Sequence, residues 1–366
     1  MKLISGDRIF SLLVLGVALA GLAIFSSAAL GLLARDGGSV SRNILLQGGL
    51  GFGLGFLAFV IVRVVPFAQI KRFAPHMYVA TFIFTALVFA PGVGFHAGGA
   101  TRWINLGFTT VQPAEFLKIG FVLMLAWWLA PRARQLASPK KGLIPFIGMI
   151  TLPAALLLAQ PNTSTTLLII ATGIIMYFAA GAPWRDFGIL VFIAALALGA
   201  VILVRPYVLQ RIETFFNPSA HSLGSGYQIR QSLIAIGSGG LLGRGFGQSV
   251  EKFNYLPESD GDSIFAVFAE ETGFVGAVIL LALFVALAAR GMVIAGNSND
   301  LFGGLVAFGF SFMIILQAFV NICAMLGIIP LTGLPLPFVS HGGTALLATF
   351  LMCGLILNVA SHRRSA

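Results

Sequence analysis

The feature that most constrains this chain is its succession of long, nearly uncharged apolar stretches. A helix that crosses a bilayer needs about 20 mostly apolar residues, and ten stretches of this chain come near that length. Hydrophobic residues make up 58% of the chain and charged residues 9%, whereas a typical soluble domain has about 25% charged residues. The runs are continuous and lack the alternation of a membrane β-barrel. The sequence therefore predicts an all-α, polytopic membrane protein with about ten transmembrane helices.

These spans are expected to form one domain that covers residues 1–366. Ten spans place both ends of the chain on the same side of the membrane. We interpret the apolar N-terminal segment as a retained first helix, because its apolar run is long for a cleaved signal peptide and more spans follow. The expected spans are 9–33, 44–66, 77–92, 112–130, 143–160, 163–182, 187–204, 263–289, 301–328 and 339–360.

The distribution of basic residues predicts the orientation of these spans. Most Lys and Arg residues fall in segments on the N-terminal side, and the positive-inside rule makes that side cytoplasmic. On the other side they concentrate in one long extracytoplasmic loop, about 205–262, between the seventh and eighth spans, and long loops count little in the rule. We therefore expect both termini in the cytoplasm. The net charge of +10 follows from this topology, so nucleic-acid binding is not expected.

The acidic residues are concentrated in one short region. The chain has 12 Asp and Glu, and half of them lie between residues 251 and 271. Asp262 just precedes an apolar helix, where it is either an N-cap or a catalytic group. Glu258, Asp260 and Asp262 together exceed what capping requires. Glu270 and Glu271 fall about two turns into the helix, so at least one should face the bundle interior.

A second group of charged residues lies in "GGATRWINLGFTTVQPAEFLKIGF", residues 98–121. Pro113 suits the first turn of a helix. Glu115 and Lys118 follow at i, i+3, and this spacing predicts an ion pair that is either structural or part of a site. Arg102 lies on the predicted outer side, where its planar guanidinium suits a phosphate.

Two further stretches are rich in glycine or proline. "GYQIRQSLIAIGSGGLLGRGFGQS", residues 226–249, carries Arg230 and Arg244. It begins with the spacing of a short interfacial helix and is then either a phosphate-binding segment or a set of turns packed close to a helix, since it has no Walker pattern. "PLTGLPLPFVSHGGTALL", residues 330–347, interrupts a helix at membrane depth, which is tolerated only where the backbone is buried or lines a polar cavity.

In their order and placement, "ATRWINLG…QPAEFLKIG", "YQIRQSLIAIGSGGLLGRGFGQ", "LPESDGDSIFAVFAEETGFVG" and "TGLPLPFVSHGGTALL" resemble the SEDS family of shape, elongation, division and sporulation proteins, the group of FtsW, RodA and SpoVE. The resemblance covers nearly the whole chain and leans slightly toward FtsW. It implies a ten-helix bundle with peptidoglycan glycosyltransferase activity in the bacterial cytoplasmic membrane. It also implies lipid II as substrate, and as partners a class B penicillin-binding protein and other membrane proteins of the divisome or elongasome.

The resemblance also implies site residues. The essential Asp of the family motif falls on Asp262, with Asp260 as a rival because this chain has Asp-Gly-Asp-Ser where the family more commonly has His-Thr-Asp-Phe. A divalent cation, Mg²⁺ or Mn²⁺, is a possible cofactor, with Asp262 or Glu115 as a ligand, and no organic cofactor is expected. The candidate substrate-binding residues are Arg102, Glu115, Lys118, Gln228, Arg230, Gln231, Arg244, Glu258 and Ser340.

The chemistry implied is inverting glycosyl transfer, which needs a base for the attacking hydroxyl and positive charge for the leaving pyrophosphate. We expect Asp262 to supply the first, and Arg102 and Lys118, with Arg230, Arg244 or a cation, to supply the second. Two alternatives stay open. A lipid II flippase would need ionisable residues throughout the depth of the bilayer, and a scaffold for a penicillin-binding protein would not need Asp262.

Overall fold

The computed structural model describes residues 7–36, 51–97, 100–107, 109–217, 224–253 and 255–362. Several sequence predictions fall outside these ranges. They concern the start of the second expected span, residues 44–50, and the basic residues Lys2, Arg42, Arg363 and Arg364.

Each of the ten expected spans corresponds to an apolar helix in the described part of the chain. Seven helices are long and apolar enough to cross a membrane, and three apolar helices are shorter. The fold is therefore helical and polytopic, as predicted. The ten helices are α1 (Arg8–Asp36), α3 (Leu54–Val64), α4 (Phe67–Ala86), α5 (Pro113–Leu129), α6 (Leu143–Ala159), α7 (Thr163–Ala179), α8 (Trp184–Val204), α11 (Ile264–Gly296), α12 (Leu301–Met325) and α13 (Gly343–Ser361).

Some predicted boundaries were wrong. The third span was placed at 77–92, but α4 begins at Phe67 and continues into the short 3₁₀ helix η2 (Leu87–Phe89). The first turns of α4 contain charged residues, so the sequence there is not apolar enough to indicate a span. One of these residues, Lys71, pairs with Asp300 at 2.8 Å. The sequence predicts that the eighth span ends at 289, but α11 continues to Gly296. Its Arg290 pairs with Asp7 at 2.7 Å. The tenth was begun at 339, but α13 starts at Gly343.

The helices α5, α12 and α13 form the centre of the bundle. They carry the largest buried fractions among the long helices, whereas α8 lies at the edge with only 6% of its most apolar window buried. Small residues allow the central contacts to be close. A methyl group on Gly309 would lie 2.6 Å from the sulfur of Met176, so this small residue leaves room for the Met176 side chain where α12 meets α7.

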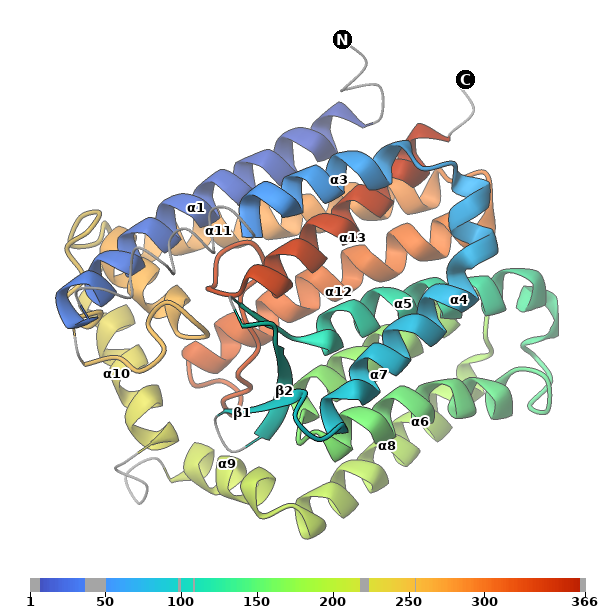
Figure 1. The fold of residues 1–366 in the computed structure, drawn as a ribbon, viewed down its shortest axis with the longest axis horizontal. Coiled ribbons are helices and arrows are strands. Elements are labelled where there is room, and N and C mark those ends of the chain that lie inside the picture. Colours follow the sequence, from blue (N-terminus) through green and yellow to red (C-terminus); the bar gives the residue numbers. More distant parts are fainter. Residues whose placement is uncertain are drawn as a thin grey trace.

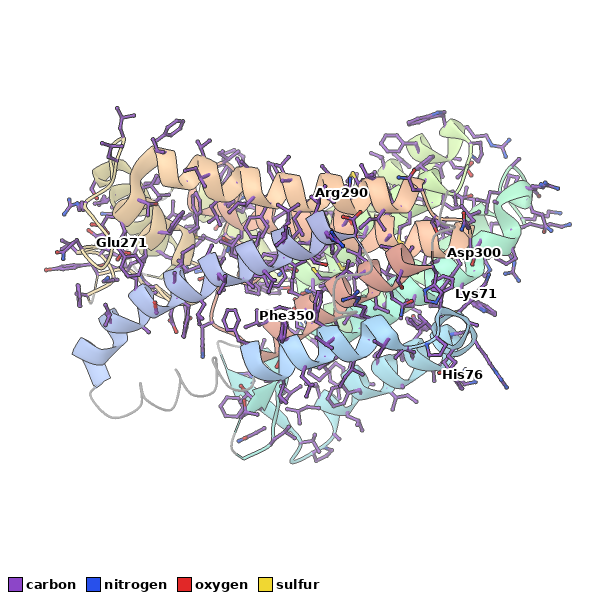
Figure 2. The ribbon with its side chains drawn as sticks, turned by 90° about the horizontal axis from the view of Figure 1, so that it is seen from above. Lys71, His76, Glu271, Arg290, Asp300 and Phe350 are labelled. Atoms are coloured by element: carbon purple, nitrogen blue, oxygen red, sulfur yellow. The ribbon has the colours of Figure 1, made fainter. Side chains whose placement is uncertain are left out.

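The two ends of the bundle differ in content. The start of α1 and the end of α13 lie at the same end (Figure 1), as an even number of spans requires. Figure 2 shows Lys71 and Asp300 near this end and Glu271 near the opposite one. The opposite end holds the helices α9 (Pro206–Phe216) and α10 (Ser225–Ser238), which the sequence placed in a long loop. The short helix expected near residue 227 is therefore confirmed as α10.

A small antiparallel sheet, which the sequence analysis did not predict, lies between α4 and α5. It comprises β1 (Gly94–Ala97), β2 (Ala100–Asn105) and β3 (Thr110–Val111), in the order β1-β2-β3. Its strands are short and follow no clear alternation, so a sequence pattern could not reveal them. The sheet covers the same end of the bundle as α9 and α10 (Figure 1).

The Gly-rich stretch after α10 is fastened to α11. The backbone of α11 breaks at Gly273, with φ of 68°. Around this break, Arg244 N donates to Glu270 O at 3.0 Å and Phe274 N donates to Gly240 O at 2.9 Å. A methyl group on Gly243 would lie 2.1 Å from Glu271 O, so the close approach requires glycine. The sequence left two interpretations of this stretch open, a phosphate-binding segment and a set of turns packed close to a helix. The structure matches the second.

Glu271 belongs to a buried cluster beside this break. Its carboxylate accepts hydrogen bonds from Ser27 Oγ of α1 at 2.7 Å and from Lys252 Nζ at 2.6 Å. The side chains of Lys252 and Glu271 are 0% and 3% exposed. Glu270 accepts from Ser249 Oγ and from the backbone N–H groups of Val250 and Glu251. Both glutamates therefore face inward and attach the loop to α1 and α11.

We expect Lys252→Met to destabilise the protein by about 3–5 kcal/mol, because it leaves the Glu271 carboxylate buried without its cation. The double variant Lys252→Met/Glu271→Leu should recover much of this loss. The free energy of unfolding of the purified protein in detergent, from denaturant titration, measures the effect.

The matched control is Lys71→Met at the other end of the bundle. The side chains of its pair with Asp300 are 45% and 39% exposed, so the loss should be at most about 1 kcal/mol. Equal losses in Lys71→Met and Lys252→Met would contradict a structural role for the buried pair.

Candidate functional site

Asp262 lies directly before α11 but does not cap it. The residue at the N-cap position is Ser263, and no side chain caps the first turn. The Asp262 carboxylate instead accepts a hydrogen bond from Gln228 Nε2 of α10 at 2.9 Å, and the same amide donates to Ser263 Oγ at 2.8 Å. The capping interpretation is therefore wrong, and Asp262 is available for another role.

The surroundings of Asp262 favour its protonated form. Burial raises the pKa of Asp262 to about 6, and the negative charge of Glu258 raises it too. The hydrogen bond from Gln228 and the positive charge of Arg211 act against this rise. A carboxyl group with a pKa near the working pH can accept a proton and later release it, which is the requirement for a general base.

Two amides of α12 hold the backbone around this carboxylate. Asn321 Nδ2 donates to the carbonyl oxygens of Asp262 and Leu334, each at 2.8 Å. One turn earlier, Gln317 Nε2 donates to Pro335 O at 2.8 Å, and its Oε1 accepts from Lys118 Nζ at 2.9 Å. The Pro-rich segment before α13 is mostly buried, and these amides bond its carbonyl groups, as its depth in the bundle demands.

The ion pair predicted at the start of α5 is present. α5 begins at Pro113, and Lys118 Nζ lies 2.8 Å from Glu115 Oε2, with the two side chains 0% and 2% exposed. Through Gln317, this pair is connected to the segment that carries Leu334 and Pro335. Lys118 therefore supports the backbone of the site, and both charges of the pair are already compensated.

Arg102 is displaced from the β-ladder by a bulge. Phe95 pairs with Trp103 and His96 pairs with Thr101, so Arg102 is the extra residue between them. Bulges redirect side chains and are common beside active sites. The Arg102 guanidinium donates to two carbonyl oxygens of the α6–α7 turn, those of Gln160 and Pro161.

A second arginine faces Arg102. Burial lowers the pKa of Arg102, and the positive charge of Arg211 of α9 lowers it further. Arg211 Nη1 donates to Thr332 O at 3.3 Å. A methyl group on Gly333 would lie 3.8 Å from Asp262 Oδ2 and 3.9 Å from Arg211 Nη2. In the described part of the chain, neither arginine has a carboxylate within salt-bridge distance. Their hydrogen-bond partners are carbonyl groups, and Asp262 is near enough to Arg211 for their charges to interact.

The residues present do not form a divalent-cation site by themselves. The described residues contain no group of three His, Cys, Asp or Glu side chains that could hold a metal ion. Glu115 is paired with Lys118, which leaves Asp262 as one carboxylate ligand. Mg²⁺ commonly binds through one or two carboxylates together with substrate phosphates, so a cation that arrives with a phosphorylated substrate remains a prediction.

Other candidate residues are less closely associated with Asp262. Arg230 is exposed and lies two residues beyond Gln228, so the two do not share a helix face. Gln231 Nε2 donates to Tyr227 Oη at 3.0 Å. Arg244 pairs with Glu270 at 3.5 Å, about two helical turns along α11 from Asp262.

The remaining two candidates, Ser340 and the rival Asp260, take part in turns. Leu336 N donates to Ser340 Oγ at 2.7 Å, so this hydroxyl closes a turn ahead of α13. His341 N donates to Asp260 O at 2.7 Å, and the Asp260 carboxylate lies 3.7 Å from His341 Nδ1. Asp260 is therefore directed toward His341, whereas Asp262 is directed toward Gln228.

Nearly the whole chain matches a known family. Residues 7–365 match the family of FtsW, RodA and SpoVE, described as cell cycle protein. The chain belongs to the FtsW/RodA/SpoVE family. The match confirms the resemblance inferred from the sequence motifs.

Relatives of this FtsW/RodA/SpoVE protein are similar over most of their length. Stage V sporulation protein E of Bacillus subtilis is 38% identical over 312 residues, 85% of each chain. The probable peptidoglycan glycosyltransferase FtsW of Alkalilimnicola ehrlichii is 37% identical over 363 residues, which cover 98% of this chain and 90% of the relative. Peptidoglycan glycosyltransferase MrdB of Escherichia coli is 36% identical over 315 residues, 85% of this chain and 84% of the relative.

Solved structures agree with the fold of this family member. The crystal structure of the rod shape determining protein RodA of Thermus thermophilus superposes with a TM-score of 0.69, at 29% identity and over 100% of both chains. A chain from a study of a peptidoglycan synthase complex that coordinates polymerization and crosslinking gives a TM-score of 0.79, at 29% identity and over 99% of both chains.

Sequence reasoning missed three residues of the site in this FtsW/RodA/SpoVE protein. Gln317 and Asn321 lie at i, i+4 inside an apolar helix, and this spacing of two buried amides was the available signal. Arg211 was counted among the basic residues of the long loop. Its role depends on the path of α9 over the end of the bundle, which no local pattern reveals.

Proposed function

We propose that this chain is a peptidoglycan glycosyltransferase that polymerises lipid II into glycan strands by inverting transfer. The observation that carries this proposal is the arrangement at Gly333. Asp262, whose pKa is raised, and the guanidinium of Arg211 both lie close to the point where a methyl group on this glycine would be. Curated relatives that carry the name peptidoglycan glycosyltransferase, which align over most of the chain, support the same activity.

In the proposed reaction, Asp262 removes the proton from the 4-hydroxyl of one sugar. The hydroxyl oxygen forms a bond to C1 of a second sugar, and the bond between C1 and the diphosphate oxygen breaks. An inverting displacement has the attacking and leaving oxygens on opposite faces of the sugar, by analogy with inverting glycosidases. A base and a cation that lie close to one point can act on the attacking hydroxyl and on the leaving diphosphate of the same sugar.

The leaving diphosphate carries away the electron pair of the broken bond as negative charge. Arg102 and Arg211 provide positive charge, and among the described residues neither has a carboxylate within salt-bridge distance. Guanidinium groups that are already held by carbonyl oxygens need little reorganisation, so they stabilise the developing charge effectively. Lys118 was expected to share this role, but its pairing with Glu115 and Gln317 favours a supporting one.

The location of the charged groups supports the assignment of a lipid-linked substrate. Asp262, Arg102 and Arg211 belong to elements at the end of the bundle opposite the start of α1 (Figure 1). With cytoplasmic termini, this end faces the outside of the bacterial cytoplasmic membrane, where sugars and phosphates would lie above a lipid tail among the helices. We further propose a class B penicillin-binding protein as partner, because a similar chain occurs in a peptidoglycan synthase complex.

We expect Asp262→Asn to lower the rate of lipid II polymerisation by about 10²–10⁴, the usual contribution of a general base. The change keeps the shape of the side chain and its contact with Gln228. The rate of glycan formation from labelled lipid II measures the effect, with purified protein and its penicillin-binding partner.

Asp260→Asn is the matched control, because it alters the same type of residue two positions earlier and should keep most of the activity. Polymerisation by a folded Asp262→Asn variant at the normal rate would rule out Asp262 as base. Movement of lipid II across the bilayer without polymer would favour the flippase instead.

The pH dependence of the rate should report the state of Asp262. The base acts in its ionised form, so activity should rise with pH through about 6 and then level off. Glu258→Gln removes a negative charge that raises this pKa, so the rise should move to lower pH. Gln228→Leu removes a hydrogen bond that lowers the pKa, so the rise should move to higher pH.

These two shifts are measured from the polymerisation rate across a pH series for each variant. Shifts in the same direction for Glu258→Gln and Gln228→Leu would show that a different group controls the acid limb.

A further inference from the structure

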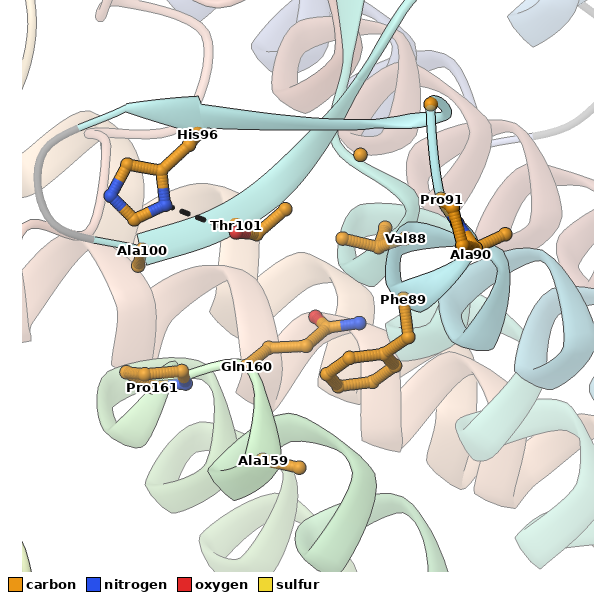
Figure 3. A pocket seen from close by; sticks show the side chains of 12 residues that line it. Val88, Phe89, Ala90, Pro91, His96, Ala100, Thr101, Ala159, Gln160 and Pro161 are labelled. Carbon is orange, nitrogen blue, oxygen red and sulfur yellow. Dashed lines mark hydrogen bonds between the residues drawn. The ribbon is translucent and has the colours of Figure 1, made fainter.

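A pocket of about 410 Å³ is lined in part by the α6–α7 turn, whose carbonyl oxygens accept from Arg102. Its walls come from the β1–β2 hairpin, η2 and the adjoining turn, and the α6–α7 turn (Figure 3). The volume falls within the range of about 300–1,000 Å³ that is typical of small-molecule sites. Nothing in the reaction described above uses this pocket.

Among the described residues that line it, the pocket has one ionisable side chain, the imidazole of His96, and its other polar groups are uncharged. None of its twelve lining residues, all within the described part of the chain, is Asp, Glu, Lys or Arg. Thr101 and His96 contact each other, with Thr101 Oγ1 3.1 Å from His96 Nδ1. Phe89 contributes an aromatic ring that is 50% exposed. Figure 3 shows Thr101, Gln160 and Phe89 around the same space.

Gln160 has an unused hydrogen-bond acceptor in this pocket. Its side chain is 1% exposed, and its Nε2 donates to Thr85 O at 2.7 Å. Its Oε1 is enclosed and has no hydrogen-bond partner. A buried acceptor without a partner costs about 1–3 kcal/mol, and this cost favours a shift of the amide toward an N–H or O–H donor of a ligand in the pocket.

The pocket and the arginine region share the α6–α7 turn. Gln160 and Pro161 line the pocket, and their carbonyl oxygens accept from the Arg102 guanidinium. A diphosphate bound at Arg102 and Arg211 would therefore place the neutral part of the same molecule beside the pocket. An aromatic ring with a few uncharged polar groups suits a sugar, whose C–H face packs on the ring while its hydroxyl and acetamido groups form hydrogen bonds.

We propose that this pocket is a saccharide subsite that binds a neutral N-acetylated sugar unit of the lipid-linked substrate, with Gln160 as hydrogen-bond acceptor and Phe89 as stacking surface. The proposal rests on the proposed function for the origin of the sugar. Binding itself requires no reaction, so it can be tested without turnover.

The first experiment measures binding of a soluble probe, di-N-acetylchitobiose, to the purified full-length protein by saturation-transfer NMR. We expect signals on the acetamido methyl groups for the unmodified protein and for Asp262→Asn. Phe89→Ala should lose them, and Gln160→Met should weaken them strongly. The matched control is Phe95→Ala, an exposed phenylalanine of β1 that does not line the pocket, and it should keep the signals.

The second experiment measures polymerisation against lipid II concentration. Phe89→Ala and Thr101→Val should raise KM about tenfold, as for the loss of about 1.4 kcal/mol of binding, with kcat nearly unchanged. Phe95→Ala should change neither constant. Thr101→Val preserves the size of the side chain and Phe89 is half exposed, so these variants should fold even if Gln160→Met does not.

The outcomes separate this proposal from the proposed function. Probe binding that requires Phe89 in a protein that forms no glycan would support the subsite and refute the polymerase. Polymerisation that proceeds normally in Phe89→Ala and Thr101→Val, without probe binding by the unmodified protein, would overturn the subsite alone.

Discussion

Two buried amides on α12 determine whether this bundle can contain its site. In a hydrocarbon environment no water is available to satisfy backbone groups, so a non-helical segment among membrane helices needs internal partners. Gln317 and Asn321 supply them to Pro335, Leu334 and Asp262. Without these bonds the segment before α13 would expose unpaired carbonyl groups to apolar surroundings, each at a cost of about 1–3 kcal/mol. The amides also fix the backbone of Asp262 relative to the centre of the bundle.

The charged side chains discussed above fall into two groups. Some are buried ions with an oppositely charged partner, and others are arginines bonded, within the described part of the chain, only to carbonyl oxygens. Buried ions such as Lys118 with Glu115, and Lys252 with Glu271, each have a partner at salt-bridge distance. They maintain the fold, because an isolated buried ion would be very costly. Arg102 and Arg211 are held by carbonyl oxygens, which orient a guanidinium but do not neutralise it. Positive charge is thereby retained where a phosphorylated substrate can use it.

Much of the fold could be predicted because its signals are local. Apolar runs located the spans, Pro113 marked the start of α5, and the i, i+3 spacing of Glu115 and Lys118 predicted their pairing. The start of α4 was missed because Lys71 is compensated by Asp300, more than 200 residues away. The sheet was missed because a two-residue strand such as Thr110–Val111 has no periodicity. Asp262 was found as a candidate, but its contact with Gln228 and its distinction from a helix cap required the packing of α10 on α11.

The break in α11 at Gly273 divides the helix into two parts with different tasks. The short part, Ile264–Thr272, follows Asp262 and is tied through Glu270 and Glu271 to the loop of residues 244–252 and to α1. The long part crosses the bundle to Gly296. The Gly-rich stretch bonds both parts across the break, because Arg244 N donates to Glu270 O and Phe274 N donates to Gly240 O. A change in bilayer thickness is accommodated by the tilt of long apolar helices, so a tilt of the long part would be transmitted through this clamp to the short part and to Asp262.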